Sequence, residues 1–152
     1  MSLVKSIINY VMWANDTIWK IAEQLTDEEF NRDFSETVGS IQRRYIHLAE
    51  DTWEWYHDWH GEEPDFLGMT RDELYHFMMD YVMKWRSLID EHTVDSFKDE
   101  RNGKVATITL DEMLFHLANH HTYHRGQIVM GLRLLGKNAQ MTDYVPYRFE
   151  IV

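Results

Sequence analysis

The chain has 152 residues, of which 15 are Lys or Arg and 26 are Asp or Glu, so its formal net charge is −11. This length predicts a single domain over residues 1–152 with enough chain to bury a hydrophobic core. The acidity argues against nucleic-acid and membrane partners, because both present anionic surfaces. The chain has no Cys, which excludes a disulfide framework, a thiolate nucleophile and a Cys-based zinc site. It has nine His. Imidazole is therefore the group to consider for any chemistry.

The N-terminal segment, residues 1–19, interrupts its apolar residues with polar ones every few positions, unlike a secretory signal. No stretch of the chain approaches the roughly 18 apolar residues that a membrane-spanning helix requires. We therefore expect a soluble protein of the cytoplasm. Aromatic residues make up 14% of the chain, which argues against disorder.

The first half of the chain predicts two long helices and a short one. Apolar residues recur at steps of three and four over residues 4–25, which is typical of an amphipathic helix. Residues 26–29, Thr-Asp-Glu-Glu, have the spacing of a capping box, so a short helical turn can begin there. After a loop at 31–40, a second long helix is expected from 40 to about 59. Gly-Glu-Glu-Pro at 61–64 ends it.

The second half begins with another capping box and then changes period. Residues 70–73, Thr-Arg-Asp-Glu, predict the start of a third long helix that ends near His92. Residues 94–98 and 105–110 flank Asn-Gly at 102–103, a dipeptide that suits the left-handed geometry of a tight turn. The latter segment is rich in β-branched residues, so we expect a small hairpin.

A third capping box, Thr109 with Glu112, predicts the last long helix, residues 111 to about 135, and Gly136 is placed to end it. The tail, 137–152, is polar first and aromatic later, and we expect it to pack back on the body. The fold class is therefore all-α: a four-helix bundle with a short β-hairpin before the last helix. Periodicity alone leaves the helix order open.

The last predicted helix carries four His within nine residues. His116 with His120, and His120 with His124, are four residues apart, so each pair points the same way and can reach one ion. His121 with His124, three apart, is a looser pair. His116 and His124 diverge by roughly 80° around the helix axis, which disfavours one ion bound by both. The spacing leaves the choice of pair open.

A third ligand has to come from another helix. His47 is favoured because it lies within a predicted helix, between the apolar Ile46 and Leu48. The alternative without a metal is that His residues four apart form a surface or hydrogen-bonded pair, although four His within nine residues favour a metal. The other candidates for the third ligand are several carboxylates together with His57, His60, His76 and His92.

Three segments carry recognisable motifs. Residues 119–128 read Asn-His-His-Thr-Tyr-His-Arg-Gly-Gln-Ile, which contains His-x3-His-Arg-Gly-Gln. Residues 10–15 read Tyr-Val-Met-Trp-Ala-Asn, a Tyr-x-x-Trp-Ala-Asn pattern, and residues 38–41, Val-Gly-Ser-Ile, precede His47. Together these segments resemble the DinB-like (DinB/YfiT-like) family of metal-binding four-helix bundles, and the resemblance covers essentially the whole chain.

The resemblance implies a divalent metal held by three His, one from the second long helix and two from the last. Carried over by position, these ligands are His47, His120 and His124, while His116 and His121 match no ligand position. Zinc is the expected metal, with nickel or iron as alternatives. The resemblance also implies a bundle of unusual helix order and a homodimer.

Three neutral imidazoles leave a tetrahedral ion with one open position, the pattern of a catalytic rather than a structural zinc site. The resemblance implies an enzyme for a small-molecule substrate that activates a low-molecular-weight thiol, an S-transferase of the bacillithiol, mycothiol or glutathione type. The lack of Cys is compatible, because the cofactor would bring the thiol. Two alternatives stay open: a hydrolase that uses metal-bound hydroxide, and a non-enzymatic dimer that binds a metal or small ligand.

Some neighbours of the predicted ligands could contact a bound molecule. Arg43, Arg44 and Arg125 could offset the protein's acidity and bind carboxylates of a thiol cofactor. The alternative is that they are surface ion-pair partners. Trp13 and Asn15 could line the pocket, although Trp on an amphipathic helix belongs more often to the core.

Overall fold

The computed structural model describes residues 2–36, 38–57, 62–91 and 96–150. In these residues the chain forms a helical bundle and one two-stranded hairpin. The elements in chain order are α1 (Leu3–Ala22), α2 (Asp27–Asn31), α3 (Ile41–Tyr56), α4 (Arg71–Glu91), β1 (Ser96–Arg101), β2 (Lys104–Thr109), α5 (Leu110–Leu134) and α6 (Tyr144–Glu150).

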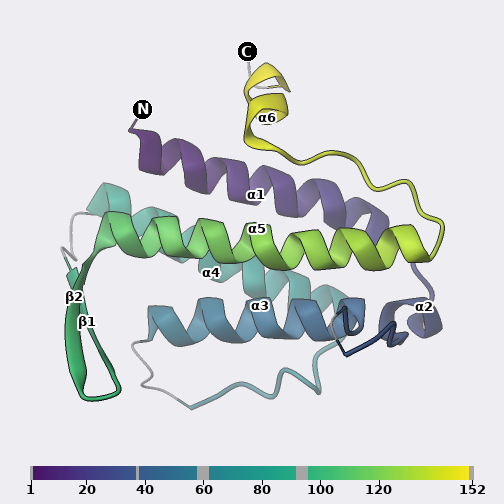
Figure 1. Ribbon diagram of the computed structural model, residues 1–152, viewed down its shortest axis with the longest axis horizontal. Coiled ribbons are helices and arrows are strands. Elements are labelled where there is room, and N and C mark those ends of the chain that lie inside the picture. Colours follow the sequence, from purple (N-terminus) through teal and green to yellow (C-terminus); the bar gives the residue numbers. More distant parts are fainter. Residues whose placement is uncertain (1, 37, 58–61, 92–95, 151–152) are drawn as a thin grey trace.

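The four long helices form a bundle in which consecutive helices are not always neighbours (Figure 1). Helix α1 packs against α5 and α4, and α3 packs against the same two helices. Therefore α1 and α3 lie diagonally opposite each other, whereas an up-and-down bundle would place them side by side. This arrangement confirms the expected unusual order, and it makes α3 and α5 direct neighbours.

The predicted helices are confirmed, with small shifts at their ends. Helix α3 ends at Tyr56, and His57 is its C-cap, so the helix is shorter than the predicted limit near residue 59. Residues 58–61 lie outside the described part of the chain. All three predicted capping boxes are present, each with reciprocal hydrogen bonds between a Thr and the Glu three residues later: Thr26–Glu29, Thr70–Glu73 and Thr109–Glu112.

The hairpin is also confirmed. Strands β1 and β2 pair antiparallel from Ser96 with Thr109 to Arg101 with Lys104. Asn102 and Gly103 form the turn, with φ of 54° and 71°, the left-handed geometry that this dipeptide favours. The first strand begins at residue 96, and the predicted residues 94–95 lie outside the described part.

The C-terminal tail packs back on the body, as expected, and it ends in the unpredicted short helix α6 (Figure 1). The Tyr144 hydroxyl lies 2.8 Å from the Ser6 hydroxyl of α1. The Tyr10 hydroxyl donates a hydrogen bond of 2.8 Å to the backbone oxygen of Thr142. Tyr147 is buried in the same cluster of aromatic rings. The tail therefore covers the N-terminal half of α1.

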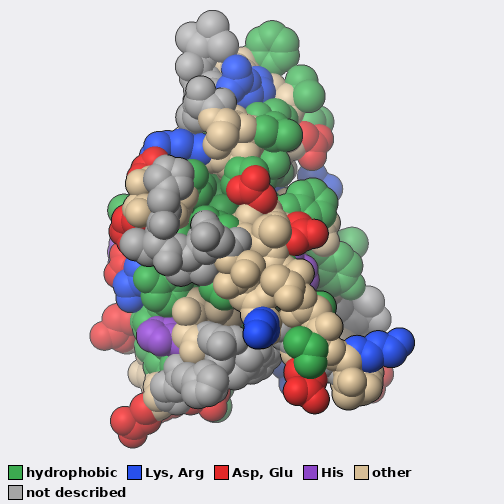
Figure 2. Space-filling model, turned by 90° about the vertical axis from the view of Figure 1, so that its left-hand side faces the viewer, with side chains coloured by type: hydrophobic (Ala, Val, Ile, Leu, Met, Phe, Trp, Pro, Cys, Tyr) green, Lys and Arg blue, Asp and Glu red, His purple; other side chains and the backbone are tan. Residues whose placement is uncertain are grey.

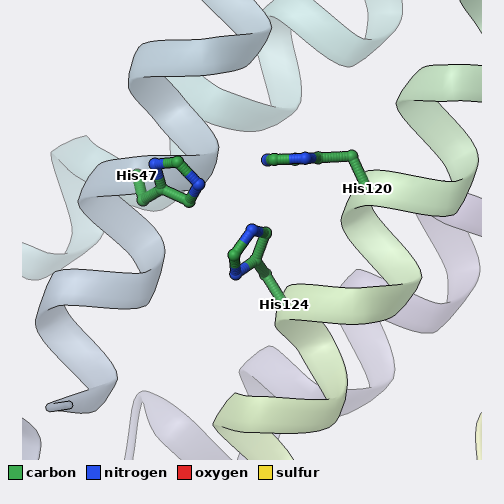
Figure 3. A group of neighbouring side chains, drawn as sticks. All are labelled: His47, His120 and His124. Atoms are coloured by element: carbon green, nitrogen blue, oxygen red, sulfur yellow. The ribbon is translucent and has the colours of Figure 1, made fainter. Parts of the chain in front are cut away.

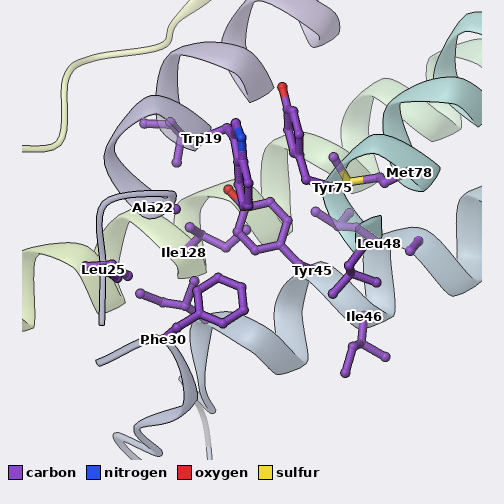
Figure 4. Close-up of a cluster of buried hydrophobic side chains, with 14 of the residues drawn as sticks. Trp19, Ala22, Leu25, Phe30, Tyr45, Ile46, Leu48, Tyr75, Met78 and Ile128 are labelled. Atoms are coloured by element: carbon purple, nitrogen blue, oxygen red, sulfur yellow. The ribbon is translucent and has the colours of Figure 1, made fainter. Parts of the chain in front are cut away.

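Hydrophobic side chains gather in two halves of the core. In one half, shown in Figure 4, the rings of Trp19 and Tyr75 stack with centroids 4.2 Å apart, and Tyr45 meets Trp19 edge-on at 5.3 Å. The other half surrounds Trp85, which is fully buried. The Trp85 indole N–H donates to the backbone oxygen of Thr52 at 3.1 Å. Buried polar side chains lie between the two halves.

The surface carries charges of both signs. On the face that Figure 2 shows, the end of the bundle where the hairpin lies, acidic and basic side chains are interspersed rather than gathered in one patch. Within the described residues, no helix combines the length and the apolar character needed to cross a membrane.

The Thr109 cap is expected to stabilise α5, the helix that carries two of the predicted ligands. Replacement Thr109→Ala removes the side-chain acceptor for the Glu112 backbone N–H, so the free energy of unfolding should fall by about 1 kcal/mol. Urea denaturation measures this change. Thr109→Ser keeps the hydroxyl and is the matched control, and equal losses in both variants would contradict the role of the cap.

Candidate metal centre

The three predicted ligands converge between α3 and α5 (Figure 3). His47 lies on α3, and His120 and His124 lie on successive turns of α5. One nitrogen atom from each ring lies within 4.8 Å of one from each of the others. The ring centroids are 4.4 to 5.1 Å apart. The bundle therefore brings together the three residues that the family motif selects, including a pair that helical spacing alone left open.

The other described His side chains lie elsewhere. His116 is exposed on α5, where its ring packs edge-on against Trp55 with centroids 4.6 Å apart. His76 is exposed on α4, and Nε2 of His57 lies 2.9 Å from the Tyr81 hydroxyl. Two further candidates lie outside the described residues: His60 and His92.

Gln127 fixes the orientation of the His124 ring. Its amide oxygen accepts a hydrogen bond of 2.6 Å from Nδ1 of His124. Because Nδ1 carries the proton, Nε2 of His124 keeps its lone pair. Metal-binding His residues generally donate from their second nitrogen in this way. No role was predicted for Gln127, but its position three residues after His124, on the same helix face, is a signal that could have indicated one.

The electrostatic surroundings lower the pKa of two of these imidazoles, those of His47 and His124. Burial lowers the pKa of His124 to about 4, although the hydrogen bond with Gln127 acts in the opposite direction. Burial also lowers the pKa of His47, opposed by the Asp51 carboxylate and assisted by the positive charge of Arg44. Above pH 7 both rings are therefore in the unprotonated form that binds metal ions.

The surroundings of Nε2 of His120 show whether the cluster fits an ion. This atom is buried and has no hydrogen-bond partner among the described residues. Oδ2 of Asp51 lies 2.9 Å away, but its direction does not meet hydrogen-bond geometry. A buried polar atom without a partner costs about 1–3 kcal/mol. An ion between the three rings would satisfy Nε2, so the donor set fits a divalent metal.

Comparisons with known proteins identify the family of this chain. The model of the DinB family matches residues 1–150. The chain belongs to the DinB family. Its sequence is 24% identical to Protein DinB of Bacillus subtilis (strain 168) over 159 residues, which covers 94% of this chain and 92% of the relative.

The fold is similar to that of YfiT from Bacillus subtilis, with a TM-score of 0.65 and 14% sequence identity over 91% of each chain. YfiT is described as a probable metal-dependent hydrolase with an unusual four-helix bundle topology. This likeness confirms the DinB/YfiT-type bundle.

Beside the His cluster, this DinB-family protein has a buried polar side chain that the motif does not explain. His121 is fully buried and points into the core. Nδ2 of Asn15 donates to its Nδ1 at 2.9 Å, and its Nε2 donates to Oγ1 of Thr52 at 3.0 Å. The Thr52 hydroxyl donates in turn to the backbone oxygen of Leu48. A neutral His121 ring therefore has both nitrogens satisfied.

Arg125 extends this chain of hydrogen bonds. Its Nη1 donates to Oδ1 of Asn15 at 3.1 Å, and its Nη2 donates to the Tyr10 hydroxyl at 2.8 Å. Further bonds reach the hydroxyls of Thr122 and Thr142, so all four acceptors are uncharged. Asn15, Thr52, His121 and Arg125 thus form a buried polar layer between the two halves of the core, here called the polar layer.

Two expectations are wrong at this point. Arg125 is only 3% exposed, so it is neither a surface ion-pair partner nor available to the carboxylate of a cofactor. Asn15 is buried and forms hydrogen bonds with His121 and Arg125, so it does not line a pocket. Both side chains instead hold α1 against α5.

A pocket of about 550 Å³ opens beside His47. Arg43 and Arg44 line it together with the acidic Asp33 and Glu50. Nε of Arg44 donates to the backbone oxygen of Val38 at 2.9 Å, which places this guanidinium at the N-terminal end of α3. The pocket therefore offers charges of both signs next to one of the three imidazoles.

Acid should destabilise the fold through His121. Burial, and then the charge of Arg125, hold the pKa of His121 well below its ordinary value of 6.5 in the folded protein. Between these values the unfolded chain binds a proton that the folded protein excludes, so stability is complete above pH 6.5 and falls as the pH drops. We expect a loss of up to about 1.4 kcal/mol per pH unit below that point.

This loss is measured by urea denaturation of the metal-free protein at several pH values. The range from roughly 7.5 to 5.5 spans the pH at which His ordinarily titrates. His121→Gln keeps a donor and an acceptor but cannot titrate, so its unfolding free energy should depend less on pH than that of the wild type. Exposed His76 provides the control variant, His76→Gln, which should follow the wild type. Parallel curves for all three proteins would refute the assignment to His121.

Proposed function

We propose that this protein is a metal-dependent enzyme in which His47, His120 and His124 hold a divalent ion, with zinc as the first candidate. The observation that carries the proposal is the convergence of three ligand nitrogens within 4.8 Å from two neighbouring helices. The unsatisfied Nε2 of His120 supports it. When bound by three imidazoles, such an ion keeps a coordination position open and lowers the pKa of a water or thiol there.

The chain's own residues prepare this site in distinct ways. Gln127 holds the proton on Nδ1 of His124 and so directs Nε2 toward the cluster. Arg44 places a positive charge near His47 and His124, which favours their neutral forms and attracts an anionic nucleophile. The pocket that His47 lines gives a small-molecule substrate a place beside one of the three imidazoles.

For the nucleophile we propose a small thiol of the bacillithiol, mycothiol or glutathione type, which makes the reaction an S-transfer. The family resemblance supports this class. The sequence contains no Cys, so the thiol has to come from a cofactor. Such thiols carry carboxylates, and Arg43 and Arg44 on the pocket wall offer positive charge for them.

A second candidate function is hydrolysis, with water in place of the thiol. The observation in its favour is the fold shared with YfiT, a probable metal-dependent hydrolase. The third possibility is a protein that binds a metal or a small ligand without turnover. The homodimer, the cytoplasmic location and the absence of nucleic-acid and membrane partners stay predictions.

Elemental analysis of the purified protein tests the metal site. We expect the purified wild type to contain a divalent metal. His47→Ala and His124→Ala should each lose this metal, because two imidazoles cannot hold the ion as tightly as three and the affinity should fall by at least roughly tenfold. His116→Ala is the matched control on α5, since His116 is exposed and lies outside the cluster. Undiminished metal in both cluster variants would refute the site.

A thiol-consumption assay with a panel of electrophiles separates the candidate functions. An S-transferase should consume a small thiol only when the metal is present, with activity lost on chelation and in His124→Ala. A hydrolase should turn over ester or amide substrates without thiol. The absence of turnover in both assays by metal-loaded protein would leave binding without catalysis.

A further inference from the structure

The outward face of α5 has no charged side chain over most of its length. From Met113 to Leu132 the sequence contains one charged residue, Arg125, and that side chain is buried in the polar layer. The chain as a whole is 27% charged, so an uncharged face of this length is unusual for it. In Figure 1 this helix crosses the front of the bundle, and no other described element lies in front of it. The exposed residues of this face, here called the α5 stripe, are Phe115, Asn119, Thr122, Tyr123, Gly126 and Met130.

The α5 stripe has the composition of an interface core. Phe115 and Tyr123 are each 65% exposed and Met130 is 54% exposed, although all three side chains are large and mostly apolar. Beside the N-terminal half of the stripe, a groove of about 320 Å³ runs between α1 and α5, and Leu3 and Ile7 line its far side. All residues that line this groove are uncharged. Depletion of charge together with exposed Phe, Tyr and Met is typical of the centre of a protein–protein interface.

The charges at the two ends of the stripe are opposite in sign. Glu112 is exposed just before Phe115, and Arg133 is exposed just after Met130. If two copies of α5 lie antiparallel, Glu112 of each copy meets Arg133 of the other, whereas a parallel pair would join like charges. Antiparallel helices also bring the opposite ends of their dipoles together. The end charges therefore favour a second copy of this chain as the partner, in the antiparallel orientation.

The spacing of the stripe is symmetric about its centre, between residues 122 and 123. In an antiparallel pair centred there, every residue of the stripe lies opposite another residue of the stripe, and the same register brings Glu112 opposite Arg133. Phe115 then faces Met130 of the other copy, and contacts between an aromatic ring and a thioether are favourable. One register thus satisfies the apolar side chains and the end charges together.

Gly126 leaves room for close packing in this register. A Cβ atom at this position would meet no other atom within 4 Å, so the space in front of the helix is open. Asn119 of the other copy lies opposite and can occupy that space. A glycine inside a helix lowers its stability, and the close approach of a second helix gives this glycine a role.

We propose that two copies of this chain associate through the α5 stripe, antiparallel and related by a two-fold axis near residues 122 and 123. Such an interface is self-complementary, as in most homodimers. A net charge of −11 makes two copies repel each other over other faces, which favours an uncharged one. The proposal gives the expected homodimer a face and an orientation, and it is independent of the metal. The pocket that His47 lines contains no residue of α5, so the stripe and this pocket are separate surfaces.

The mass of the protein in solution, measured by sedimentation velocity over a range of concentrations, tests the interface. The wild type should have twice the chain mass of 18.4 kDa. Gly126→Glu places a negative charge from each copy near the axis and should raise the dissociation constant of the dimer by at least about 100-fold. Because the space at Gly126 is open, the monomer should keep its fold, which circular dichroism checks. Met83→Glu is the matched control: it adds the same charge at an exposed apolar residue of α4 and should stay dimeric.

Disulfide cross-linking tests the orientation, because the chain has no Cys of its own. In the antiparallel pair, Asn119 lies opposite Gly126 of the other copy, while like positions are offset along the axis by roughly 10 Å. A disulfide requires Cα atoms within about 7 Å of each other. Oxidation should therefore cross-link an equal mixture of Asn119→Cys and Gly126→Cys, and neither variant alone.

Each outcome decides one part of the proposal. A wild type that is monomeric at every concentration, or a Gly126→Glu protein as dimeric as Met83→Glu, would overturn the interface. Cross-links in either single variant alone, or none in the mixture, would overturn the antiparallel register. The metal content of His47→Ala bears on the metal site and not on the stripe, so the two proposals stand or fail separately.

Discussion

The polar layer fixes how the helices of this bundle meet. Arg125 donates to Asn15, Asn15 donates to His121, and His121 donates to Thr52. The chain of bonds joins α5 to α1 on one side and to α3 on the other. A rotation or slip of α5 would leave several buried groups without partners, which costs far more than such bonds contribute when they are made. The layer thus determines the rotation of α5 that turns His120 and His124 toward α3.

The layer also divides the hydrophobic core. One half packs around Trp19, Tyr45 and Tyr75, and the other around Trp85. Arg125 carries a charge into the boundary between them, where its acceptors are uncharged. Burying a cation in this way adds little to stability, and the gain is a unique packing of α1 against α5. The His cluster lies beside this boundary, because His120 and His124 flank His121 and Arg125 on α5.

The sequence was sufficient for features that depend on neighbours along the chain. Helical periodicity, the Thr–Glu capping boxes and the Asn102–Gly103 turn located the bundle helices and the hairpin, whereas α6 is only 7 residues long and too short for a periodic signal. The family motif, rather than spacing, selected the cluster that the structure brings together. The environments of Arg125 and Asp51 could not be predicted, because each depends on atoms of a different helix. Periodicity gives the face on which a residue lies but not what faces it.

The diagonal placement of α1 and α3 has a consequence for the order of folding. His47 and the two imidazoles of α5 belong to helices that are distant in sequence, so no local hairpin of the nascent chain can assemble the three rings. Closing that long loop is slow compared with helix formation. An ion bound by all three rings would therefore bind only after α5 has docked. It would stabilise the assembled bundle rather than nucleate its folding.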